Sequence, residues 1–254
     1  MKLADELKRE GGWLFRWRSY LPLAILPIAV PAFADSGWFA AAFGSAAEDR
    51  WDWACLILSL AGLAMRVLTI GYVPSMTSGR SIRHHAASLN TTGMYSIVRH
   101  PLYVANFLVF IGFTLTLKSG LFTLFAALAY VLYYERIVVA EEDFLESLYG
   151  DEFRRWAART PTAIPRLTLW IANDLSFSWR TALLREYHGV MLIGAVFFIC
   201  KLLQGLLIRQ QSLREWIGVE RLYVTMLAGC LAFYVIALFV RKRTNWLIVE
   251  GRGP

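Results

Sequence analysis

Apolar residues are gathered into six long blocks along the chain, and shorter polar segments rich in charge separate them. A helix needs about 20 consecutive apolar residues to cross a bilayer, and most of these blocks approach or exceed that length. The pattern therefore predicts an all-α membrane protein with about six transmembrane helices. The predicted blocks are residues 20–43, 51–73, 102–117, 120–140, 188–208 and 221–240.

Two of the blocks have features that predict more than a simple span. The first contains Pro22, Pro27 and Pro31, so we expect a kinked helix. Basic residues precede this block and Ala32-Phe33-Ala34 resembles a signal-peptide cleavage site, but the many prolines and the long basic region favour a retained helix. The third block is short and is joined to the fourth by Lys118-Ser119-Gly120, which predicts a short helical hairpin at the core.

The longest polar stretch runs from residue 141 to residue 186. Its apolar residues recur at helical spacing between acids and arginines, which predicts an interfacial helical segment lying on the membrane. The chain then divides into N-terminal transmembrane helices (1–73), a core with the hairpin and this polar segment (74–187), and a C-terminal transmembrane helix pair (188–254).

Basic residues are distributed unequally between the two sides that this topology defines. Nineteen lysines and arginines lie in the N-terminal segment, residues 74–101, residues 135–187 and the tail after residue 240, against five on the other side. Because cytoplasmic loops carry the excess of Lys and Arg, we expect both termini and the 141–186 segment in the cytoplasm. The net charge of +7 fits an anionic leaflet better than nucleic acid, since the basic residues flank apolar blocks.

Composition changes the picture little beyond this. Cys55, Cys200 and Cys230 lie in apolar blocks without CxxC spacing, which indicates small buried side chains and neither a disulfide nor a metal site. Arg66 and Lys201 lie inside apolar blocks and are candidates for function, although we favour structural roles, with Arg66 extending to the interface.

One basic motif directly precedes the third apolar block: Arg99-His100-Pro101-Leu102-Tyr103, with Tyr95 shortly before it. Proline suits the first turn of a helix, and the free N–H groups of a helix N-terminus attract anions. A cationic side chain beside such an end would bind a carboxylate or phosphate well. In contrast, we interpret His84 and His85 as part of a solvated or lipid-contacting loop.

An acidic motif follows the fourth block on the same predicted side. It begins with Glu141-Glu142 and continues with Tyr149-Gly150, Phe153 and Trp156. If blocks three and four form a hairpin, this motif meets Arg99 and His100 at the membrane surface.

Together the two motifs resemble the isoprenylcysteine carboxyl methyltransferase and phospholipid methyltransferase superfamily. The similar pattern is Gly-x-Tyr-x-x-Val-Arg-His-Pro-x-Tyr, an apolar hairpin, then Glu-Glu-x-x-Leu followed by spaced aromatics, over roughly residues 89–165. One departure is Ala105, where the family usually has glycine.

The resemblance implies an integral-membrane enzyme that uses S-adenosylmethionine to methylate a lipid or lipid-modified acceptor. It implies that the cofactor's amino-acid end lies against Arg99, His100 and Tyr103, beside Tyr95, and that the acids bind its ribose or amine. We assign Arg99 and Glu142 as catalytic residues, with Glu142 the base if the acceptor is an amine. The cofactor-binding assignments are Tyr95, His100, Tyr103 and Glu141.

Two alternatives stay open at this point. Membrane sterol reductases, which use NADPH, resemble the same Arg-His-x-x-Tyr region, although Glu-Glu-x-x-Leu favours the methyl donor. A non-catalytic lipid-binding membrane protein is the other. Among acceptors, we favour an anionic carboxylate or phosphate headgroup, because six arginines near the motifs would concentrate anions. These are Arg80, Arg83, Arg99, Arg136, Arg154 and Arg155.

Overall fold

The computed structural model describes residues 3–18, 24–74, 88–249 and 252, and in these ranges the chain is helical, with no strand. Five segments are long and apolar enough to cross a membrane, and α6 is a shorter apolar helix. The predicted all-α membrane fold is thereby confirmed. In chain order the helices are α1 (Leu3–Trp17), α2 (Leu26–Ala34), α3 (Trp38–Phe43), α4 (Ser45–Tyr72), α5 (Met94–Ile97), α6 (Pro101–Leu115), α7 (Gly120–Tyr149), α8 (Asp151–Arg159), η2 (Leu167–Leu169), α9 (Trp179–Leu203), the π-helical turn η3 (Gln204–Ile208), α10 (Leu213–Val219) and α11 (Arg221–Arg243).

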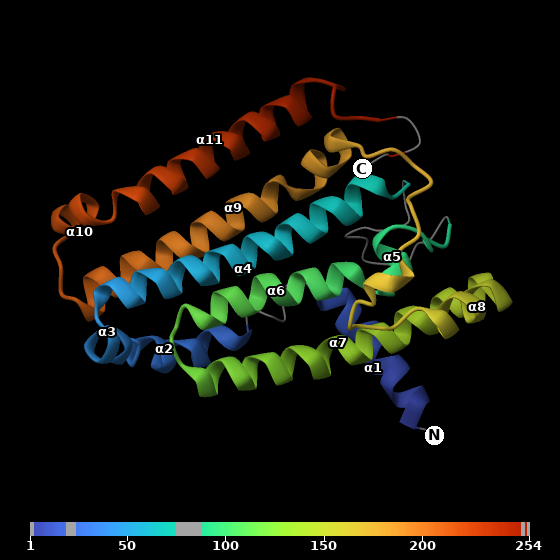
Figure 1. Cartoon of the computed structure of the whole chain (residues 1–254), viewed down its shortest axis with the longest axis horizontal. Helices are drawn as coiled ribbons and strands as arrows, with labels where there is room; N and C mark the ends of the chain where they lie inside the picture. The colour runs from blue at the N-terminus through green and yellow to red at the C-terminus, as the bar shows by residue number, and fades with distance from the viewer. Residues whose placement is uncertain (1–2, 19–23, 75–87, 250–251, 253–254) are drawn as a thin grey trace.

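The long helices lie side by side along one direction (Figure 1). Helix α4 packs against both α6 and α9, α9 packs against α11, and α6 packs against α7. Helix α1 lies along α7. One end of the bundle gathers α3, α10 and the α6–α7 turn, and the opposite end gathers α5, α8 and the start of α6 (Figure 1).

The first predicted span is divided in two. Pro27 lies in the first turn of α2 and Pro31 lies inside it, and α3 follows only after a turn. A proline within a helix removes a backbone hydrogen bond and favours a kink or break. We predicted a kinked helix here, and the structure has a break between α2 and α3, after Pro31. Pro22 lies outside the described residues.

The predicted hairpin is formed by α6 and α7. Its turn is closed by Ser119, whose hydroxyl accepts a hydrogen bond from the Phe122 backbone N–H at 3.3 Å. Helix α7 does not end at residue 140 as the apolar block suggested, because no proline or glycine interrupts it before Gly150. There the backbone turns to φ +50°, a conformation that favours glycine, and the short helix α8 begins. The polar segment is thus the end of α7, then α8, then an irregular stretch up to α9.

Small residues let α6 lie close to α4. A Cβ atom added at Gly62 would lie 2.6 Å from the Ala105 carbonyl oxygen, and one at Gly112 would lie 2.7 Å from the Cys55 carbonyl oxygen. Between them, the Ser59 hydroxyl donates to the Val109 carbonyl at 3.2 Å. Close backbone approach of this kind is a common way for membrane helices to pack. It fixes α6, and with it the Arg-His-Pro motif, on α4.

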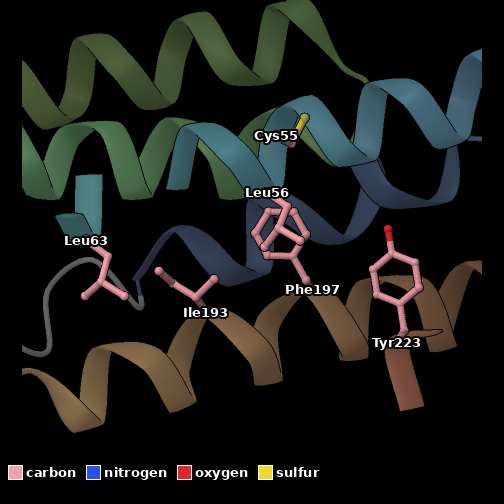
Figure 2. Close-up of a cluster of buried hydrophobic side chains, with 6 residues drawn as sticks. All are labelled: Cys55, Leu56, Leu63, Ile193, Phe197 and Tyr223. Atoms are coloured by element: carbon pink, nitrogen blue, oxygen red, sulfur yellow. The ribbon is translucent and has the colours of Figure 1, made fainter. Parts of the chain in front are cut away.

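The largest apolar cluster joins α4, α9 and α11. Figure 2 shows Leu56 and Leu63 of α4 facing Phe197 and Ile193 of α9, and Cys55 and Tyr223 belong to the same cluster. Cys55 is a small buried side chain there, as predicted, whereas Cys200 and Cys230 are half-buried, and all three are free thiols. The C-terminal helix pair therefore shares a core with the helices that precede the motifs.

A buried ion network lies at the end of the bundle remote from the motifs. The Lys118 ammonium, whose side chain is 0% exposed, lies 3.1 Å from carboxylate oxygens of both Glu48 and Asp52. Lys201 pairs with the same Asp52 at 2.7 Å, and Arg209 pairs with Glu48. These contacts tie the hairpin turn, α4 and the end of α9 together, which agrees with the predicted structural role of Lys201.

Candidate active site

The Arg-His-Pro motif lies where α5 gives way to α6. Pro101 is in the first turn of α6, as predicted, and His100 is its N-cap. Arg99 and His100 are therefore held between two helices rather than within either one, and their side chains reach toward α7.

The hairpin brings the acidic motif onto these two residues. The Arg99 guanidinium donates from Nη1 to Glu142 Oε2 at 3.0 Å, and His100 Nε2 lies 2.9 Å from Glu142 Oε1. Each carboxylate oxygen of Glu142 thus has one partner in the basic motif. The predicted meeting of the two motifs is present in the structure.

Glu141 is joined to the same cluster through Tyr103. The Tyr103 hydroxyl donates to Glu141 Oε2 at 2.7 Å, and the Tyr103 ring stacks on His100 with centroids 5.6 Å apart. His100 Nδ1 lies 3.8 Å from the same Glu141 oxygen. Five of the six predicted site residues therefore form one contiguous cluster: Arg99, His100, Tyr103, Glu141 and Glu142.

Tyr95, the sixth predicted residue, is placed differently. Its backbone carbonyl accepts a hydrogen bond from the Trp156 indole at 3.0 Å. Trp156 and Phe153 are both buried. The aromatic residues of α8 thus pack beside α5, and the Trp156 hydrogen bond helps to fix the position of α5.

The stretch after α8 covers the basic motif, which the sequence did not predict. The Arg99 backbone N–H donates to the Pro161 carbonyl at 2.8 Å, and the Arg166 N–H donates to the Ile97 carbonyl at 2.9 Å. The Arg99 side chain also donates to the Thr162 hydroxyl. Thr162 follows Trp156 after a short interval, but no residue pattern marks it as a partner of Arg99.

Arg66 does not extend to the interface, so that expectation is wrong. Its guanidinium forms a bidentate pair with Glu186 of α9 at 2.6 and 2.7 Å and donates to Asn106 Oδ1 at 2.5 Å. Sequence reasoning missed Glu186 and Asn106, because the partner carboxylate lies 120 residues away in the chain. Of the other basic-loop residues, Arg80, Arg83, His84 and His85 lie outside the described residues.

The side chains of the cluster have charges of both signs, which suit a zwitterionic or cationic ligand. The formal charges of the Arg99, Glu141 and Glu142 side chains sum to −1. The side chains of Glu141 and Glu142 are 29% and 22% exposed, so a ligand can reach them. The Arg99 Nε atom is buried and has no hydrogen-bond partner, which leaves one donor available to a carboxylate.

The phospholipid methyltransferase family matches residues 55–152, a segment that contains α6, α7 and the whole five-residue cluster. The match shows similarity to this family over less than half of the chain. The family match ends before α9 and α11, so Glu186 lies beyond it.

Curated relatives of this phospholipid methyltransferase segment have two kinds of name. The cobalt-zinc-cadmium resistance protein CzcN of Cupriavidus metallidurans is 38% identical over 128 residues, which are 48% of this chain and 57% of the relative. The nickel-cobalt-cadmium resistance protein NccN of Alcaligenes xylosoxydans xylosoxydans is 38% identical over 125 residues, 48% of this chain and 56% of that protein. The protein-S-isoprenylcysteine O-methyltransferase of Schizosaccharomyces pombe is 32% identical over 95 residues, 35% of this chain and 40% of that enzyme.

The chain thus spans about half the length of the curated relatives it matches. No solved structure matches it significantly. In the described part of the chain, no group of three or more His, Cys, Asp or Glu side chains is arranged to hold a metal ion.

Proposed function

We propose that the protein is an integral-membrane methyltransferase that uses S-adenosylmethionine to methylate a lipid or lipid-modified acceptor. The observation that supports this most is the five-residue cluster, which lies within the phospholipid methyltransferase segment. A relative of that segment is named as an isoprenylcysteine O-methyltransferase. The NADPH-dependent and the non-catalytic alternatives have no such support.

The charges of the cluster fit this cofactor. Its amino-acid end carries an ammonium and a carboxylate, and its sulfonium carries a further positive charge. The unpartnered Arg99 Nε and the Arg99–His100 end of α6 suit the carboxylate, whereas Glu141 and Glu142 suit the positive groups. The Tyr103 and His100 rings add an aromatic wall beside these charges.

When bound, S-adenosylmethionine supplies an electrophilic methyl group for in-line transfer to a nucleophile. The roles of this chain are to orient the two reactants and to exclude water from the site. Glu142 holds Arg99 and His100 in a fixed arrangement, and it is the group that could accept a proton from an amine acceptor. An oxygen anion needs no such base.

We propose an anionic oxygen acceptor, as a carboxylate or phosphate headgroup, because a relative is named as an O-methyltransferase. The structure weakens the expectation that six arginines near the motifs concentrate anionic acceptors. Arg136 is paired with Glu10, and Arg154 is paired with Glu146 and Asp151, so these two arginines contribute little to a field that concentrates anions.

Methyl transfer from labelled S-adenosylmethionine into a total lipid extract is the expected result for the purified protein. After separation, the label should lie in a methyl ester formed from an anionic lipid, since the proposed acceptor is an anionic oxygen. Label only in water-soluble products would contradict the lipid acceptor, and label in an amine lipid would contradict the anionic one. Calorimetry provides the control: tight NADPH binding without S-adenosylmethionine binding would overturn the methyltransferase assignment.

We also propose that the cluster and both termini face the cytoplasm, from the asymmetry of basic residues. A cysteine placed at the exposed Ser147, near the end of α7, should escape an impermeant thiol reagent applied to intact cells. A cysteine at the exposed Arg214 of α10, at the opposite end of the bundle (Figure 1), should react. The reverse labelling pattern would show that the orientation is wrong.

A further inference from the structure

Glu186 and Arg66 form a charged pair within two membrane-spanning helices. The Glu186 side chain is 3% exposed and the Arg66 side chain is 16% exposed. Each Glu186 oxygen accepts one hydrogen bond from the guanidinium, from Nε at 2.7 Å and from Nη2 at 2.6 Å. This bidentate geometry fixes the plane of the guanidinium as well as its position.

Holding α4 against α9 does not require such a pair. Well-packed apolar side chains of similar volume usually stabilise a buried contact as well as a buried ion pair does, or better. Moreover, the same two helices already share the apolar contacts of Leu56 and Leu63 with Ile193 and Phe197 (Figure 2). What the ion pair adds is orientation, because it directs the remaining guanidinium nitrogen, Nη1, at Asn106.

From Asn106 a chain of side-chain contacts continues toward the candidate active site. Asn106 lies beside the Tyr134 side chain, and the Tyr134 ring stacks on the Tyr130 ring with centroids 4.2 Å apart. The Tyr130 hydroxyl donates to the Tyr103 backbone carbonyl at 2.9 Å. The Tyr134 ring also packs on the Tyr103 ring, with centroids 4.8 Å apart.

The chain of contacts ends on a residue of the five-residue cluster. Tyr103 stacks on His100 and donates to Glu141. A shift of the Tyr103 side chain would therefore move the side chains of both His100 and Glu141. Two of the steps from Arg66 to Tyr103 are hydrogen bonds, and side-chain contacts of Tyr134 with Asn106 and Tyr130 join them. Glu186 is the first member of this chain, and it lies outside the phospholipid methyltransferase segment.

We propose that Glu186 is a positioning residue for the methyl-transfer site, acting through Arg66, Asn106, Tyr134 and Tyr130 to orient Tyr103. This inference rests on the proposed function, because it assigns to α9 a role in binding S-adenosylmethionine. It also gives the C-terminal helix pair a role beyond forming part of the core.

The test compares S-adenosylmethionine binding by the full-length protein and three variants, using calorimetry alongside thermal unfolding. Glu186→Gln should raise the Kd about tenfold or more, since small misplacements of binding groups cost this much. Asp52→Asn is the matched control, because the Asp52 side chain is also 3% exposed and ion-paired but lies at the far end of the bundle. It should lower stability without changing the Kd.

A charge swap separates positioning from a merely structural role. Arg66→Glu combined with Glu186→Arg keeps an ion pair between α4 and α9, so stability should recover. However, a glutamate at position 66 cannot donate to the Asn106 oxygen, so the Kd should stay raised. The swap also decides the question if Glu186→Gln does not fold.

Three results would overturn the inference. They are an unchanged Kd in Glu186→Gln, a Kd that recovers together with stability in the swap, and an equal rise in Asp52→Asn. Failure of the unmodified protein to bind S-adenosylmethionine would instead overturn the proposed function, and this inference with it.

Discussion

Replacement of Glu142 by alanine is expected to abolish methyl transfer while the protein still folds. Glu142 pairs with both Arg99, at 3.0 Å, and His100, at 2.9 Å. Without it, Arg99 keeps the Thr162 contact but loses its carboxylate, and the arrangement that binds the donor is lost. Removing one preorganised polar group from an active site typically lowers kcat by about 10²–10³-fold, and we expect at least that.

Arg99→Ala should have the same effect, since it removes the other half of the pair. Glu146→Ala is the control: it lies one helical turn further along α7, and its side chain is 42% exposed and paired with Arg154. Exposed pairs contribute little, so this variant should keep nearly full activity. Label transfer into lipid measures all three. Full activity in both Glu142→Ala and Arg99→Ala would show that the site is wrongly assigned, even if the reaction class is right.

Asp52→Ala is expected to lower the free energy of unfolding by about 3–5 kcal/mol, the usual cost of removing one partner of a buried ion pair. Its carboxylate lies 3.1 Å from Lys118 and 2.7 Å from Lys201, whose side chains are 0% and 3% exposed. Both ammonium groups would keep only their other carboxylates, Glu48 and Asp49.

The neighbouring Asp49→Ala offers a matched comparison in the same turn of α4. Asp49 also pairs with Lys201, at 3.1 Å, but its side chain is 53% exposed, so its loss should cost less than about 1 kcal/mol. Thermal or denaturant unfolding in detergent micelles would measure both variants. Equal stability of the two variants would show that burial does not determine the strength of this network.

The sequence predicts those parts of the site that depend on local order along the chain. The Arg-His-Pro motif starts a helix and Glu141-Glu142 follows an apolar block, so one hairpin suffices to bring Arg99, His100, Tyr103, Glu141 and Glu142 together. The prediction needs only the topology of α6 and α7, and their apolar pattern supplies it.

The remaining parts depend on contacts between distant segments. Glu186 is an ordinary glutamate near the start of an apolar block, and only the packing of α9 on α4 reveals it as the partner of Arg66. Thr162 reaches Arg99 because the irregular stretch after α8 folds back over α5. The extent of α7 was also underestimated, because the acidic residues at 141 and 142 end the apolar pattern without ending the helix.

Because α7 is unbroken, its length determines how far Glu142 lies from the hairpin turn along the direction that crosses the bilayer. From Gly120 to Glu142 the helix advances 1.5 Å per residue, about 33 Å in total, and the hydrocarbon layer of a bilayer is about 30 Å thick. The length of α7 therefore sets the distance between the hairpin turn and Glu142. With the hairpin turn at one boundary of the bilayer, it delivers Glu142 to the level of the lipid headgroups at the other. We therefore expect the proposed methyl transfer to depend on membrane thickness, because a thinner or thicker bilayer shifts the headgroup layer relative to Glu142, whose height is set by the length of α7.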